Sequence, residues 1–163
     1  MVLILVLPQQ YPYILMGLAG NFIMHFFLMF LSLRTRISVL DKAHLYPFNE
    51  IHKKEIGKDS KVDYAGMPDQ GNGWYSRTLP YEKWVTFNNA QRTAMNYVEA
   101  FPHLIIFSLV SGVYYPNYTL AGVWIYILGR ILYSFGYRKE TSFRIPGALL
   151  QMIVMIMILV LSF

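Results

Sequence analysis

The chain contains no cysteine and few charged residues. Without cysteine, the protein has no disulfide, no thiolate nucleophile of its own and no Cys-ligated metal. Any thiol chemistry therefore needs a thiol that the substrate supplies. Only 14% of the 163 residues are charged, whereas 55% are hydrophobic. Together with a mean hydropathy of +0.36, this composition indicates a membrane protein with a single domain, residues 1–163.

Several functional signatures are also missing from the sequence. The four histidines (His25, His44, His52 and His103) show no metal-ligand spacing, so no metal is expected. The basic residues are interleaved with apolar helix rather than gathered on a soluble face, so nucleic acid is not an expected partner. The opening MVLILVLP has no basic n-region and is interrupted by proline, so we do not expect a signal peptide.

Four long apolar stretches are present, at about 12–33, 90–114, 118–137 and 145–163. Each is close to the ~20 residues that a helix needs to cross a lipid bilayer. The second and third connections are short, which is typical of helices that run up and down beside one another. The sequence therefore predicts an all-α fold, an integral membrane four-helix bundle.

The first connection, residues 37–86, is long and rich in turn signals such as YPFN, GMPDQGNGW and TLPYE. We expect an extended loop insertion between the first two membrane helices. With little apolar surface, such a segment becomes ordered only by packing on its own bundle or on a partner. Its candidate anchors are Trp74, Tyr75, Tyr81 and Trp84. The alternative is that these aromatics form a belt at the membrane surface.

The excess positive charge lies at the apolar helices. Acidic and basic residues are equal in number between 37 and 86, so the net charge of +5 comes from the rest of the chain. There Glu99 and Glu140 oppose seven cations: Arg34, Arg36, Arg92, Arg130, Arg138, Lys139 and Arg144. The first and third connections hold the basic loop residues, so both are expected on the positive-inside side of the membrane.

Polar residues recur at helical spacing inside two of these stretches. Arg92, Asn96 and Glu99 share one face of the second helix, and Arg130, Tyr133 and Tyr137 share one face of the third. One interpretation is internal pairing, in which Glu99 neutralises Arg92 or Arg130 and locks the helices together. However, Arg34 and Arg144 add further cations. The arginines thus outnumber the single acid, Glu99. This surplus of positive charge favours a small ligand with several negative groups, and Glu99 favours one positive group on it.

Two motifs carry a family resemblance. The pattern FxxxxRxxxNxxExxP, on Phe87, Arg92, Asn96, Glu99 and Pro102, resembles the second-helix signature of the MAPEG family, the membrane-associated proteins of eicosanoid and glutathione metabolism. GRILYSFGY, residues 129–137, is similar to the family's third-helix motif. The start VLPQQYPYILMGLAGNFIM resembles the microsomal glutathione transferase 3 branch most.

The resemblance implies glutathione as the thiol substrate and a lipophilic electrophile or hydroperoxide as the second one. It places the glutathione contacts at Arg34, Arg92, Asn96, Glu99, Arg130, Tyr133 and Tyr137. Arg144 falls where related enzymes have the arginine that activates the thiol. It also implies a homotrimer with sites between subunits. The absence of a presequence favours the endoplasmic reticulum, and a mitochondrial membrane stays open because internal targeting would not be visible in the sequence.

The sequence departs from the family in three places, one of which is Ala100, where the leukotriene C4 synthase branch has a Tyr after the Glu. Thr35 interrupts the basic run at the end of the first helix, where Arg36 is the available substitute, and the long insertion has no counterpart in typical members. A second interpretation therefore stays open. In it the protein is a catalytically silent accessory subunit of a larger membrane assembly, such as a mitochondrial respiratory complex, and docks on hetero-complex subunits through residues 37–86.

Overall fold

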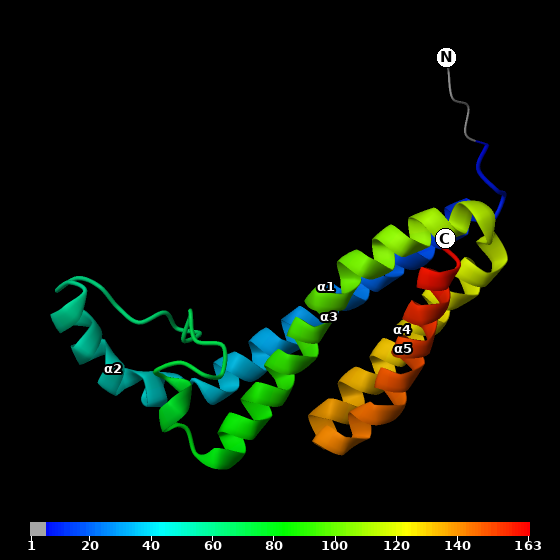
Figure 1. The fold of residues 1–163 in the computed structure, drawn as a ribbon. Helices are drawn as coiled ribbons and strands as arrows, with labels where there is room; N and C mark the ends of the chain where they lie inside the picture. The colour runs from blue at the N-terminus through cyan, green and yellow to red at the C-terminus, as the bar shows by residue number, and fades with distance from the viewer. Residues whose placement is uncertain (1–5) are drawn as a thin grey trace. The chain divides into compact units, whose positions relative to one another are not determined.

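The computed structural model describes residues 6–163, so most of the MVLILVLP segment lies outside the described residues. In order, the helices are α1 (Tyr11–Val39), α2 (Lys42–Glu55), α3 (Tyr81–Tyr114), α4 (Pro116–Lys139) and α5 (Ile145–Val160) (Figure 1). Short 3₁₀ turns, η1 (Ser76–Thr78) and η2 (Thr141–Arg144), precede α3 and α5.

Four of these helical segments are long and apolar enough to span a membrane. They are Tyr11–Val39, Tyr81–Tyr114, Pro116–Lys139 and Thr141–Val160. The predicted all-α fold with four membrane helices is therefore confirmed. Proline separates α3 from α4: Pro116 begins α4, where its missing N–H is not needed, and it disfavours helix at Tyr115. Only Tyr115 lies between the two helices.

The chain divides into two compact units, each described here by itself. Unit 1 combines the chain up to Phe27 with Met95–Phe163, and unit 2 is Leu28–Ala94. Unit 1 therefore contains parts of α1 and α3 together with all of α4 and α5. In this unit α4 and α5 lie side by side (Figure 1). Their close approach depends on Gly147, because a Cβ atom there would lie 2.2 Å from the backbone nitrogen of Tyr133.

Buried polar side chains connect the helices of unit 1. Asn21 is fully buried on α1 and donates to the carbonyl of Val123 on α4 at 3.3 Å. The hydroxyl of Tyr97 on α3 donates to Asn21 Oδ1 at 2.9 Å. In hydrocarbon such groups have no water to bind, so they are hydrogen-bonded between helices. The bonds tie α1 to α3 and α4 at one level of the unit.

Unit 2 has its own apolar core. Val39, Leu40, Leu45, Leu79 and Phe87 are buried together, and Val62, Tyr75 and Trp84 pack against them. The core includes α2, a helix that the turn-rich sequence did not predict. Pro47 lies inside α2, but Asp41 caps its start by accepting the His44 N–H at 2.8 Å. Such a cap contributes about 1 kcal/mol.

Two of the four predicted aromatic anchors belong to this core. Tyr75 and Trp84 pack on it, and the Trp84 indole N–H donates to the Gly71 carbonyl at 2.9 Å. Trp74 and Tyr81 are instead 71% and 78% exposed. The segment therefore becomes ordered on a core of its own.

Asp69 organises the loop between α2 and α3. Its carboxylate accepts hydrogen bonds from the N–H groups of Gly71, Gly73 and Ser76 and from the Ser76 hydroxyl. Its backbone carbonyl accepts from the guanidinium of Arg36 on α1. Arg36 is 4% exposed, so it fastens the loop to α1 and is not a free substitute in the interrupted basic run.

We expect acid to loosen this loop. Burial raises the pKa of Asp69, but the hydrogen bonds from Ser76, Gly71 and Gly73 outweigh burial and hold the pKa below its ordinary value. Because the folded-state pKa lies below the unfolded value of about 3.9, the carboxylate stabilises unit 2 above about pH 4. This contribution is lost as the pH falls through the folded-state pKa.

Asp69→Asn should remove that pH dependence and weaken the loop at neutral pH by about 1–3 kcal/mol, because an amide NH₂ then faces N–H donors. Hydrogen exchange of residues 56–80 between pH 3 and 7 measures both effects. The matched control is Asp59→Asn, since Asp59 is exposed in the same loop. Equal pH dependence in the wild type and Asp69→Asn would contradict the assignment.

Candidate functional site

Three of the predicted site residues form a continuous hydrogen-bonded chain in unit 1. The Tyr133 hydroxyl on α4 donates to Asn96 Oδ1 on α3 at 2.5 Å. The Asn96 amide in turn donates to Glu99 Oε2 at 3.3 Å. Asn96 and Glu99 lie three residues apart, so they meet on one face of α3. Glu99 is exposed, whereas Tyr133 is only 7% exposed. The chain therefore runs from an accessible carboxylate to a buried phenol.

Two further predicted residues, Tyr137 and Arg144, extend this chain from Tyr133 through ring and cation–π contacts. The rings of Tyr133 and Tyr137 lie 5.6 Å apart on α4. The Arg144 guanidinium carbon lies 4.9 Å from the centre of the Tyr137 ring, a cation–π contact. Arg144 ends η2 and is half-buried. The structure thus brings Asn96, Glu99, Tyr133, Tyr137 and Arg144 together in one unit, with an acid at one end and a guanidinium at the other.

Small residues on α4 let η2 and α5 approach closely enough to place Arg144. At Gly136, a Cβ would lie 2.2 Å from the Phe143 carbonyl oxygen. At Gly129, it would lie 2.9 Å from Gln151 Cγ. Such small residues are typical of close helix contacts in membranes. The sequence GRILYSFGY therefore supplies both the tyrosines and the space for the arginine beside them.

Arg130 is placed differently from the other predicted contacts. It is 2% exposed and donates to Gln151 Oε1 on α5 at 2.7 Å. Its guanidinium carbon lies 4.3 Å from the centre of the Tyr97 ring and 5.0 Å from that of Tyr133. These contacts suit a residue that holds α3, α4 and α5 together and supports Tyr133. Its predicted contact with glutathione stays a prediction.

The internal-pairing interpretation is also not what the structure shows for Glu99. Within residues 6–163, Glu99 takes part in no ion pair, and the three ion pairs of this range all lie in unit 2. Arg130 is satisfied in part by Gln151 instead. The Glu99 carboxylate therefore keeps acceptor capacity beyond the single bond from Asn96.

Gln151 is a residue that the sequence analysis missed. It is 7% exposed, and its amide donates to the carbonyls of Gly129 and Gly147 at 3.0 and 2.9 Å while its oxygen accepts from Arg130. Of these three hydrogen bonds, the two with Gly129 and Arg130 tie α5 to α4. A signal was present, because Gln151 is the lone strongly polar residue in the last apolar stretch.

Arg34 and Arg92 belong to unit 2, and both are exposed. The Arg34 guanidinium lies 5.9 Å from the centre of the Phe30 ring, one turn earlier on α1. Exposed arginines have donors available for carboxylates. Their predicted part in ligand binding stays a prediction.

No group of three or more His, Asp or Glu side chains in the described part of the chain is placed to hold a metal ion. His25 lies among aromatic rings, 5.3 Å from Tyr97 between ring centres. His44 donates to the Tyr75 carbonyl in unit 2. His25 therefore has a packing role and His44 a hydrogen-bonding role.

The family comparison covers every one of these residues. The model of the MAPEG family matches residues 14–163, which include α1 from its second turn onward and all later helices. It describes the family as a whole, so the resemblance to the microsomal glutathione transferase 3 branch stays a prediction. With four membrane-spanning segments and a match over most of its length, the chain belongs to the MAPEG family.

Proposed function

We propose that the protein is an integral membrane glutathione transferase or peroxidase that acts on a lipophilic electrophile. The observation that carries this proposal is the contact chain in unit 1 from Glu99 through Asn96, Tyr133 and Tyr137 to Arg144. Glutathione carries an ammonium group, two carboxylates and a thiol. An accessible acid and a half-buried guanidinium suit the ammonium and the thiolate respectively.

Glu99 is the proposed partner of the ammonium group. It is exposed, and the Asn96 amide holds one of its oxygens at 3.3 Å. Asn96 is itself fixed by Tyr133, whose hydroxyl donates to its carbonyl oxygen. The carboxylate is therefore oriented before the ligand arrives, which lowers the entropy lost on binding.

Arg144 is the proposed activator of the thiol. A free cysteine thiol has a pKa of about 8.5 and is mostly protonated at neutral pH, whereas the thiolate is the nucleophile. A guanidinium beside the sulfur stabilises the thiolate, but arginine stays protonated and cannot remove the proton itself. The proton therefore leaves to solvent as the thiolate forms.

The thiolate then has two possible reactions. With an epoxide, sulfur forms a bond to carbon, the carbon–oxygen bond breaks, and the oxygen takes up a proton. With a hydroperoxide, sulfur attacks the outer oxygen, the alcohol leaves, and a second glutathione converts the resulting sulfenic acid to disulfide and water. Both substrates are apolar enough to reach unit 1 from the bilayer. We include a homotrimer in the proposal, which native mass spectrometry would test.

The accessory-subunit interpretation is not part of this proposal. Its main support was that a turn-rich segment of residues 37–86 needs something to pack on. Unit 2 supplies that support through its own core and through the Asp69 hydrogen bonds. The order of the segment is thus explained without a partner.

Glu99→Gln tests the proposed function. It should raise the KM for glutathione about tenfold to a hundredfold, because it removes a charge-assisted hydrogen bond worth about 1.5–3 kcal/mol. The kcat at saturation should change little. The measurement is conjugation of an activated aryl halide by the full chain in detergent micelles.

A second substrate makes this experiment specific. N-Acetylglutathione has no ammonium group, so the wild type should discriminate against it and Glu99→Gln should not. The matched control is Glu140→Gln, since Glu140 is the other exposed acid of unit 1 and lies at the end of α4. Equal discrimination by the wild type and Glu99→Gln would overturn the assignment.

A further inference from the structure

A small pocket in unit 2 has a character that the proposed enzyme site does not explain. It has a volume of about 260 Å³ and lies between α2 and the chain just before η1. Phe48, Ile51 and Glu55 line it from one face of α2, at spacings of three and four residues. Pockets that enclose a drug-sized ligand have volumes of about 300–1,000 Å³. The pocket is thus suited to a single chemical group or headgroup.

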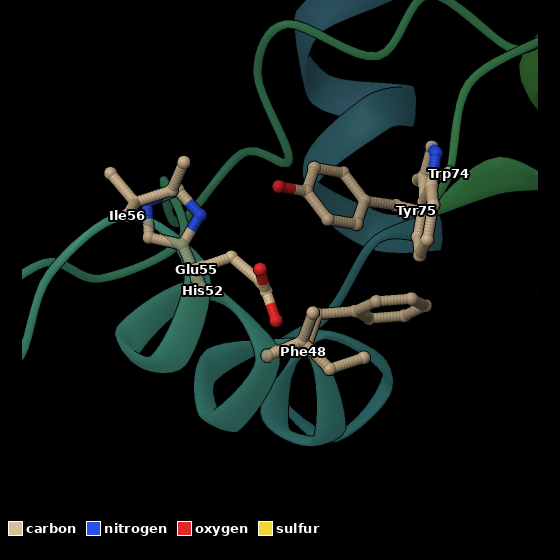
Figure 2. Close-up of a pocket in the computed structure, with 7 residues that line it drawn as sticks. Phe48, His52, Glu55, Ile56, Trp74 and Tyr75 are labelled. Atoms are coloured by element: carbon tan, nitrogen blue, oxygen red, sulfur yellow. The ribbon is translucent and has the colours of Figure 1, made fainter.

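Phe48, Trp74 and Tyr75 form the aromatic part of the pocket wall, and Ile51, His52, Glu55 and Ile56 complete it. Phe48 and Tyr75 meet edge to face with ring centres 5.0 Å apart. His44 Nε2 donates to the Tyr75 carbonyl at 2.8 Å, which holds that part of the chain against α2. Figure 2 shows the rings of Phe48 and Tyr75 bordering the same space, with Trp74 beside them.

The only acidic group lining the pocket is the carboxylate of Glu55, which faces the same space (Figure 2). Its ion-pair partner is Lys54 at 3.6 Å, and both side chains are exposed. Such surface pairs are weak and exchange readily. Aromatic faces together with a carboxylate attract an alkylammonium group through cation–π and charge interactions. An anionic ligand would instead be repelled by Glu55.

Unit 2 is connected to the membrane on both sides. α2 starts three residues after the end of α1, and α3 begins three residues after η1 ends, with both α1 and α3 long enough to span a bilayer. Of the residues that line the pocket, Trp74 and Ile56 are 71% and 70% exposed. Acids and bases are equal in number between 37 and 86, so this segment has no excess positive charge to bind anionic lipids.

We propose that this pocket binds the trimethylammonium group of a choline-type lipid headgroup. The rings of Phe48 and Tyr75 contact the methyl groups, and the Glu55 carboxylate balances the charge. The exposed lining residues Ile56 and Trp74 contact the remainder of the lipid. The site shares no residue with the enzyme site of unit 1, so the two proposals stand or fall separately.

The test uses the full chain in maltoside micelles, which contain no choline. The probes are dihexanoylphosphatidylcholine, free phosphocholine, and a lipid analogue in which a tert-butyl group replaces trimethylammonium, so that the headgroup keeps its shape but loses its positive charge. Saturation-transfer NMR from the protein's aromatic protons reports contact with the methyl groups, and titration gives the affinity. The lipid should bind at least about tenfold more tightly than either other probe.

Variants locate the site. Phe48→Leu keeps apolar bulk but removes the ring, and it should weaken lipid binding about tenfold. Glu55→Gln alters an exposed side chain and leaves the fold intact, and it should also weaken binding several-fold. The matched control is Glu50→Gln on α2, since Glu50 is exposed and pairs with Lys53 outside the pocket.

Three results would overturn the proposal. Equal binding of the tert-butyl analogue would show an apolar pocket with no preference for charge. Binding of free phosphocholine as tight as that of the lipid would exclude a lipid headgroup as the ligand. Unchanged affinity in both Phe48→Leu and Glu55→Gln would place any bound lipid elsewhere on the protein.

Discussion

Replacing Arg144 with alanine is expected to lower glutathione conjugation about a hundredfold at pH 6 while glutathione still binds. An adjacent opposite charge lowers a pKa by about one to three units, and each unit changes the thiolate fraction tenfold when the pH lies below the pKa. Arg144 is half-buried and already positioned over the Tyr137 ring at 4.9 Å. Its loss removes the cation without removing Glu99 or Asn96.

The pH profile separates thiol activation from a general structural defect. In the variant the thiol pKa returns to about 8.5, so the thiolate reappears as the pH rises past that value. The ratio of wild-type to variant rates should therefore fall steadily between pH 6 and 9. A damaged fold would instead keep this ratio constant.

Two controls sharpen the Arg144 experiment. Arg144→Lys keeps the charge and should recover a large part of the rate. Lys139→Ala removes a nearby cation that contacts Phe143 at 5.4 Å rather than Tyr137, and it should behave as the wild type. Ultraviolet absorbance of the bound thiolate measures thiolate formation, and equilibrium dialysis measures glutathione binding. Full thiolate absorbance in Arg144→Ala would assign the activation to another residue.

The membrane helices were predictable because their signal is long and local. Each needs about twenty apolar residues, and Pro116 marks where α3 gives way to α4. Helix α2 was not predictable in this way. It is short, polar and interrupted by Pro47, and it is stabilised by packing of Leu45 on a core drawn from α1, α3 and the loop. Tertiary contacts outweigh local propensity there.

The residues of the candidate site were easier to predict than their roles. Helical spacing places Asn96 with Glu99 and Tyr133 with Tyr137, as the structure has them. Residue spacing along one helix does not reveal which hydrogen-bond partners a neighbouring helix supplies. The resemblance placed Arg130 at the ligand, and that contact stays a prediction. Its partner Gln151 comes from α5, and the sequence gives no spacing that relates the two residues. Burial and partners of a polar residue in a bundle depend on helix packing.

Gly147→Ala should separate α4 from α5 and destabilise unit 1. The added Cβ would lie 2.2 Å from the Tyr133 nitrogen and 2.6 Å from the Gly129 carbonyl oxygen. Both neighbours are backbone atoms, so a change of side-chain rotamer cannot relieve the clash. Overpacking of this kind costs about 3 kcal/mol, and the better helix propensity of alanine offsets about 1 kcal/mol of it. Unfolding of the full chain in mixed micelles measures the net loss of about 2 kcal/mol.

Gly20→Ala is the matched control for this substitution. Gly20 lies on α1 in the same unit, but a Cβ there would meet only the flexible end of Ile127, at 3.4 Å. It should therefore be neutral or slightly stabilising, since it gains helix propensity without a clash.

The effect of Gly147→Ala should also reach the candidate site. Gln151 donates to the Gly147 carbonyl and accepts from Arg130, which packs against the Tyr133 ring. A shift of α5 therefore disturbs Tyr133 from one side and Arg144, three residues before Gly147, from the other. Thiolate formation should fall together with stability, whereas Arg144→Ala lowers the thiolate alone. If Gly147→Ala keeps both the stability and the thiolate formation of the wild type, α4 and α5 do not need this close contact to place Arg144.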